Sequence, residues 1–125
     1  MNRLRIPLQI FNNEAYLKRF IRGLFDTDGS FTRHHKNSGA IVEISSGDKE
    51  FLKDISLALN KLKFKTNEGA RGIKIYKKEH IERFFKIIKP SNPKHNLKYT
   101  TFKKQGFVLF TLELMKRVDS SMARR

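Results

Sequence analysis

Cysteine and tryptophan are both absent from this chain, and acidic residues are scarce beside basic ones. The absence of cysteine excludes disulfides and thiolate metal sites, and it favours a cytoplasmic location, with a nucleoid or an organellar matrix as alternatives. No apolar run reaches the roughly 20 residues that span a bilayer, and residues 1–10 lack the apolar core of a signal peptide. We therefore expect no membrane association through a spanning helix.

The scarcity of acidic residues leaves a large positive charge. Only 12 Asp and Glu oppose 27 Lys and Arg, so the formal net charge is +15. A compact domain this basic repels itself, which favours a polyanionic partner. Nucleic acid is the first candidate, an anionic membrane surface the second, and a basic but nonspecific surface the plain alternative.

The chain has 125 residues, 38% of them hydrophobic and 11 of them Phe, which predicts one folded domain with a core. We expect a single domain over residues 1–125, with an N-terminal arm at 1–11, a frayed tail at 119–125 and no internal repeat. Hydrophobic periodicity and turn residues predict the elements between them. The expected helices are 13–28, 48–62, 78–89 and 102–118, and the expected strands are 30–36, 40–46, 64–68 and 71–77.

The sequence also predicts how two of these helices begin and end. Asn12 or Asn13 can cap the first helix, and Asp48 can cap the second, whose apolar stripe includes Phe51. The first helix should stop around Asp28 and Gly29, where glycine permits a left-handed residue.

This order predicts an α+β fold, with helices on one face of an antiparallel sheet. The other face would be polar, and it would meet solvent unless it binds something. An antiparallel β-ribbon with such side chains can enter the DNA major groove and read base edges. A merely solvated strand face is the alternative for each residue taken singly. The candidate DNA-binding residues are His34, Lys36, Glu43, Lys65, Asn67, Arg71, Lys74 and Tyr76.

The first helix breaks two local rules near its end. Gly23 lies within it, although a glycine in a helix interior costs about 1 kcal/mol relative to alanine. Asp26 and Asp28 lie at its C-terminus, where the helix macrodipole is already negative. Gly23 suggests a close approach by a second backbone, and Asp28 beside Gly29 suits a cation such as Mg²⁺. Asp-Gly is also a common turn, which is the alternative interpretation.

One carboxylate per chain is too few for a good metal site, and the sequence holds no second copy of this motif. Two chains that meet at this helix would bring two Asp28 carboxylates together on shared metal ions. Such ions promote phosphodiester hydrolysis. The pattern therefore favours a homodimer with its metal site at the interface.

Residues 21–29, and the wider run Phe20–Phe31, resemble the LAGLIDADG motif of homing endonucleases. The resemblance extends to the order of helices and hairpins along most of the chain. It implies a homodimeric, site-specific endonuclease that cleaves double-stranded DNA with Mg²⁺ or Mn²⁺. It also implies an αββαββα fold with a saddle-shaped antiparallel sheet. With its single motif, the chain is similar to the homodimeric members of the family, whereas members with two motifs are pseudo-symmetric monomers.

The resemblance assigns roles to residues near the motif. Asp28 matches the catalytic, metal-binding acid, with Thr27 beside it as a further metal ligand and Asp26 as a supporting residue at the helix end. Ser46, with Ser45 as its alternative, falls where the family orders water around the metal ions. The implied dimer interface comprises Leu17, Phe20, Gly23 and Leu24.

A basic residue near the scissile phosphate is also implied. Lys94 matches it, with Lys98 as the second choice, and each is otherwise an ordinary surface charge. Arg22 departs from the pattern because it replaces a small residue, and it would have to lie on the outer side of the helix.

The chain lacks a splicing signature. The alternative functions are a catalytically inactive DNA- or RNA-binding module on the same scaffold, and a basic ribosome-associated protein.

Overall fold

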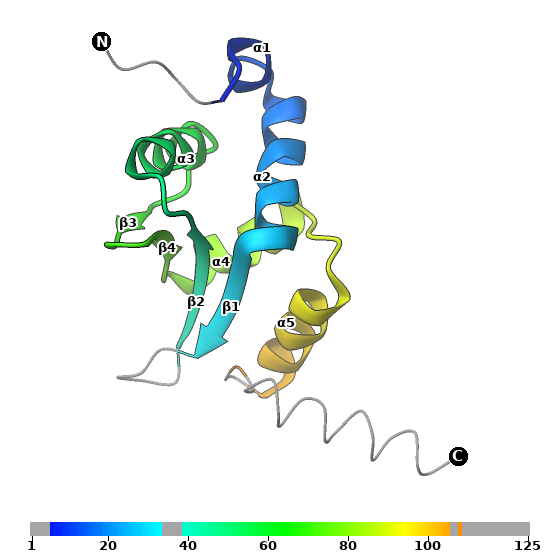
Figure 1. The fold of residues 1–125 in the computed structure, drawn as a ribbon. Helices are drawn as coiled ribbons and strands as arrows, with labels where there is room; N and C mark the ends of the chain where they lie inside the picture. The colour runs from blue at the N-terminus through cyan, green and yellow to red at the C-terminus, as the bar shows by residue number, and fades with distance from the viewer. Residues whose placement is uncertain (1–5, 34–38, 106–107, 109–125) are drawn as a thin grey trace.

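The computed structural model describes residues 6–33, 39–105 and 108, and Figure 1 shows how their helices and strands are arranged. The predicted α+β fold and its order of elements are confirmed. In chain order the elements are α1 (Leu8–Phe11), α2 (Glu14–Asp28), β1 (Gly29–Arg33), β2 (Ala40–Ser45), α3 (Lys49–Lys61), β3 (Asn67–Glu68), β4 (Gly72–Ile75), α4 (Lys78–Ile87) and α5 (Pro93–Gln105).

The strands form one antiparallel sheet in the order β1-β2-β4-β3. Their inward positions alternate as predicted, and Val42, Ile44, Ile73 and Ile75 are each at most 2% exposed. The third strand is shorter than predicted, because residues 64–66 pass along the helices before the ladder begins at Asn67. The sheet therefore keeps one apolar face under the helices and one open polar face.

Helices α2 and α3 begin at capping residues that the sequence predicts, with Asn13 rather than Asn12 as the cap of α2. Asn13 Oδ1 accepts a hydrogen bond from the Tyr16 amide at 3.0 Å, and Asp48 Oδ1 accepts from the amides of Glu50 and Phe51 at 3.0 and 3.2 Å. These bonds satisfy amides that a helix N-terminus otherwise leaves unpaired. Both starting points are therefore fixed by local chemistry.

The end of α2 differs from the expectation of a left-handed glycine. Gly29 has φ −90° and ψ 164°, an extended conformation that leads directly into β1. A Cβ at this position would lie 2.6 Å from the Phe25 carbonyl oxygen and 2.8 Å from the Phe25 Cα. Glycine is therefore needed here for close packing rather than for a positive φ.

The core is built largely from phenylalanine. Phe25 of α2 contacts the rings of Phe84 and Phe85, with centroids at 5.0 and 6.0 Å, while Phe31 of β1 lies 5.2 Å from Phe85. Tyr99 of α5 stacks on Phe85 at 4.0 Å. Edge-to-face and stacked pairs add to the gain from burial, so the aromatic side chains join α2, β1, α4 and α5.

Both ends of the described chain differ from the expected helices. Within the predicted N-terminal arm, Ile6 is fully buried and a short helix, α1, forms at Leu8–Phe11. The last described helix, α5, begins at Pro93, where no helix was predicted, with proline at a first-turn position that it favours. Most of the predicted helix 102–118, the frayed tail and the hairpin residues Asn37 and Ser38 lie outside the described residues. No helix in the described part is long and apolar enough to cross a bilayer.

Candidate functional site

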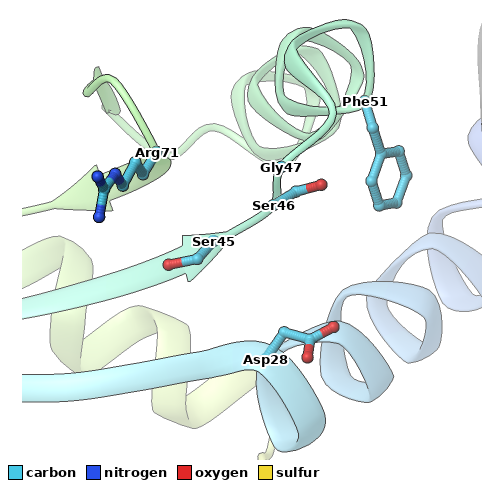
Figure 2. Close-up of a pocket in the computed structure, with 6 residues that line it drawn as sticks. All are labelled: Asp28, Ser45, Ser46, Gly47, Phe51 and Arg71. Atoms are coloured by element: carbon cyan, nitrogen blue, oxygen red, sulfur yellow. The ribbon is translucent and has the colours of Figure 1, made fainter.

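An open hollow with a volume of about 580 Å³ lies where α2 ends beside the end of β2 and the start of β4. It is lined by Asp28, Ser45, Ser46, Gly47, Phe51 and Arg71 (Figure 2). The structure thus brings the predicted residues Asp28 and Ser46 together, and it adds Arg71, which the sequence suggested only as a DNA contact. Phe51 was expected only as part of the apolar stripe of its helix, and its position gave no signal of a role here.

The hollow has two sides. Figure 2 shows the Asp28 carboxylate and the Ser46 hydroxyl pointing to the side where Phe51 lies, whereas the Ser45 hydroxyl points to the side of the Arg71 guanidinium. Asp28, Ser45 and Arg71 are exposed. A ligand in the hollow would therefore meet a carboxylate on one side and a cation on the other.

Backbone hydrogen bonds hold the rim of this hollow. The Ser46 amide donates to the Arg71 carbonyl at 3.1 Å, which ties the end of β2 to the start of β4. The Ser46 Oγ accepts from the Asp48 amide at 3.1 Å, just before α3 begins. Since that bond uses the oxygen as an acceptor, the Ser46 hydroxyl proton stays available to a ligand or water.

The hydroxyl group of Thr27, a predicted metal ligand, is engaged in hydrogen bonds within its own helix. Its hydroxyl donates to the carbonyls of Gly23 and Leu24, at 2.9 and 3.3 Å, so it points back along α2. The Thr27 carbonyl lies in the last turn, where carbonyls have no amide partner within the helix, and it is the group that Thr27 could offer a cation. Among the described residues, no group of three or more His, Cys, Asp or Glu could hold a metal ion.

A stripe along α2 is only partly covered by the described residues of the chain. Gly23 is exposed, Phe20 and Leu24 are half-buried, and Tyr16 is 51% exposed. A Cβ at Gly23 would meet no atom of the described residues within 4 Å, so nothing in that part of its own chain requires a glycine there. The prediction that Leu17 lies at a dimer interface is wrong, because Leu17 is fully buried in the core of its own chain.

The two candidate lysines lie on α5 and do not line the hollow. Lys94 is exposed in the first turn, and its amide donates to Asn92 Oδ1 at 2.9 Å. Lys98 faces inward and is 7% exposed. Burial lowers the pKa of Lys98 below its usual value, and the nearby charge of Lys94 lowers it further.

The open face of the sheet carries a polar row across all four strands. The register places Ser30 opposite Glu43, Glu43 opposite Lys74, and Lys74 opposite Asn67. Three of the predicted DNA-binding residues thus share one row, and Ser30 is a fourth member that the sequence pattern missed. Ser30 begins the predicted strand, and its place in the row depends on pairing with a distant strand.

Two other predicted DNA contacts, Lys65 and Tyr76, lie just outside β3 and β4. Lys65 is exposed before β3, and its amide donates to His80 Nδ1 at 3.1 Å. Tyr76 directly follows β4 and is half-buried. His34 and Lys36 lie outside the described residues.

Asp26 and Arg22 hold the connection between α4 and α5. Asp26 Oδ1 accepts from the amides of Ser91 and Asn92 at 2.9 and 3.0 Å, and the Asp26 carbonyl accepts from the Asn92 side chain at 3.0 Å. The Arg22 Nε donates to the Ile88 carbonyl at 2.7 Å, at the C-terminus of α4. Arg22 therefore lies away from the exposed stripe, as it must if that stripe is an interface.

Comparison with known proteins gives this geometry a family. The family model of the LAGLIDADG-like domain matches residues 15–89. A protein of Thermococcus kodakarensis named "Probable translation initiation factor IF-2" is 40% identical over 57 residues, which is 45% of this chain and 5% of that protein. The chain thus spans only a small fraction of that relative, and no solved structure matches it significantly. Because the family match covers α2, all four strands and α4 in the order found here, the chain belongs to the LAGLIDADG family.

Proposed function

We propose that this protein is a metal-dependent endonuclease that cleaves double-stranded DNA at specific sites as a homodimer. The observation that carries the proposal is the position of Asp28, exposed at the end of α2 in a hollow with Ser46 and Arg71. This hollow lies between the exposed stripe of α2 and the open face of the sheet. A catalytic group there would reach a DNA backbone that lies on the sheet.

The donor set fits a divalent metal only when two chains meet. One chain offers the Asp28 carboxylate and the Thr27 carbonyl, which are oxygen ligands of the kind that Mg²⁺ and Mn²⁺ accept. Packing of two α2 helices at Gly23 would add the same groups from a second copy, and DNA phosphates and water would complete the coordination. A bound ion would supply Lewis-acid stabilisation of the phosphate and acidify a water molecule.

The other residues of the hollow would position the reacting groups. The Ser46 hydroxyl would donate to a water beside Asp28, because its oxygen already accepts from the Asp48 amide. Arg71 would bind a backbone phosphate on the sheet side, where an arginine fork suits phosphate oxygens. The row from Ser30 to Asn67 would read base edges, while Lys and Arg elsewhere supply sequence-independent affinity.

Substitution of the central carboxylate tests the proposal. With purified protein and a library of plasmid targets, we expect nicking or double-strand cleavage in Mg²⁺ and none in EDTA. Asp28→Asn should reduce cleavage by at least about 10²–10³-fold, the usual effect of removing one charge-stabilising group, and leave DNA binding intact. Glu50→Gln removes an exposed carboxylate outside the hollow and is the matched control. Undiminished cleavage by Asp28→Asn would overturn the assignment, and binding without metal-dependent cleavage would favour the inactive binding module.

A further inference from the structure

A second hollow, of about 600 Å³, lies between the N-terminal half of α2 and the C-terminal end of α4. We call it the basic hollow, because five cations line it and Glu14 is the one acidic residue among the described residues of its lining. The cations are Lys18, Arg19, Arg22, Lys86 and Lys89. Nothing in the proposed cleavage reaction uses these residues.

The basic hollow faces away from the open side of the sheet. α4 covers the apolar side of the sheet through the buried residues Ile81 and Phe84, whereas Lys86 lies on the exposed side of the same helix. Along α2, Lys18 precedes Asp28 by ten residues, which is about 15 Å of helix. A duplex on the open sheet face is therefore separated from the basic hollow by the sheet and the helix layer.

Structural roles account for only part of this charge. Lys18 pairs with Glu14 at 3.4 Å, and the Arg22 Nε donates to the Ile88 carbonyl, which uses one of the five N–H groups of the guanidinium. The C-terminus of α4 attracts cations, but a helix end carries only about half an elementary charge. Five cations carry more positive charge than Glu14 and the C-terminus of α4 can neutralise, so the remaining positive charge suits a polyanion.

The lining residues also indicate which polyanion fits. Besides the five cations and Glu14, the described lining consists of Ala15 and Ile87, and no aromatic residue is among these described positions. Proteins that hold single strands stack bases on aromatic rings, whereas contact with duplex DNA needs only cations against backbone phosphates. We propose that the basic hollow binds the backbone of a second DNA duplex without sequence preference, so that the protein can bridge two duplexes.

A co-capture experiment tests this bridging. Full-length protein is bound to an immobilised 30-base-pair duplex of random sequence, and a second, fluorescent duplex is then added and its retention measured against salt. The double variant Arg19→Gln/Lys86→Gln removes two exposed cations and keeps good helix formers. We expect it to reduce retention of the second duplex by about tenfold and to lower the salt-dependence slope of that step by about two. Binding to the immobilised duplex should change little.

The matched control is Lys103→Gln/Lys104→Gln, which removes two exposed cations from the last turn of α5, outside the basic hollow. Equal loss with both double variants, or no loss with the first, would overturn the proposal. The proposal would also be overturned if the wild-type protein retained no second duplex, or if it bound vesicles of anionic lipid more strongly than DNA. The proposal stands apart from catalysis, because Asp28→Asn should bridge duplexes like the wild type whether or not the wild type cleaves DNA.

Discussion

Two glycines near the end of α2 occupy opposite environments. A Cβ at Gly29 would press on the backbone of Phe25, whereas a Cβ at Gly23 would meet open space. Packing within the described part of the chain thus requires a glycine at residue 29 but not at residue 23. Since an unneeded glycine in a helix interior lowers stability, the proposed contact with a second copy is what would explain Gly23.

This difference predicts opposite effects of the same substitution. Gly23→Ala should raise the free energy of unfolding of the monomer by about 1 kcal/mol and reduce self-association, because the new methyl group separates the two helices. Gly29→Ala should lower that free energy by about 1–3 kcal/mol through overpacking. Urea unfolding at low protein concentration and sedimentation over a concentration series would measure both quantities. Unchanged self-association in Gly23→Ala would contradict helix packing at this residue.

The cation that assists cleavage is also a question at the residue scale. The sequence suggested Lys94, but Arg71 lies in the hollow with Asp28 and Lys94 does not. We expect Arg71→Ala to reduce cleavage by about 10- to 100-fold, up to the effect of losing one stabilising group, and Lys94→Ala to reduce it less. Single-turnover cleavage and DNA affinity should be measured on the same substrate. A larger loss with Lys94→Ala would restore the sequence-based assignment and remove Arg71 from that role.

At the scale of elements, local chemistry made much of this site predictable. The caps Asn13 and Asp48, the end of α2 at Asp28 and the strand alternation all depend on residues close in sequence, and all are confirmed. The structural roles of Arg22 and Asp26 were not predictable, because their partners lie 65 or 66 residues away. The position of Arg71 in the hollow likewise depends on the pairing of β2 with β4.

The start of helix α5 was also not predictable from residues close in sequence. Its apolar and polar residues do not separate into clear faces, since His95 and Lys98 are buried and Leu97 is 38% exposed. Its start at Pro93 was therefore missed. We infer that its position depends on the cap formed by Asn92 and on the carboxylate of Asp26, rather than on a hydrophobic pattern.

Loss of that carboxylate should loosen α5. Asp26→Ala leaves the amides of Ser91 and Asn92 without their acceptor, which should lower the free energy of unfolding by about 1–3 kcal/mol. Amide hydrogen exchange should show reduced protection in α5 before α3 is affected. Glu14→Ala, which removes only a surface ion pair, is the control and should change stability by less than about 0.5 kcal/mol. Equal protection of α5 in wild type and Asp26→Ala would show that aromatic packing alone holds the helix.

At the scale of the whole molecule, His95 is a titratable residue whose ring is buried in the core of a strongly basic protein. Its ring lies 4.5 Å from the ring of Phe25, and its Nδ1 is buried without a hydrogen-bond partner among the described residues. Burial lowers the pKa of His95 below 6.5. The charges of Lys98 and Lys94 lower this pKa further, while the Phe25 carbonyl and Asp26 oppose the shift. Folding thus favours the neutral imidazole in a protein that carries a net charge of +15.

This lowered pKa predicts that acid destabilises the fold through His95. Below about pH 6.5 the unfolded chain binds a proton at this residue before the folded chain does. The free energy of unfolding should therefore fall as the pH drops from 6.5 toward the pKa of the folded state, and this contribution should be constant above 6.5. His95→Phe removes the titrating group and keeps a ring against Phe25, so urea midpoints of wild type and variant between pH 5 and 7.5 isolate the effect from that of carboxylates. Parallel pH profiles for the two proteins would show that His95 contributes nothing to the acid sensitivity of the fold.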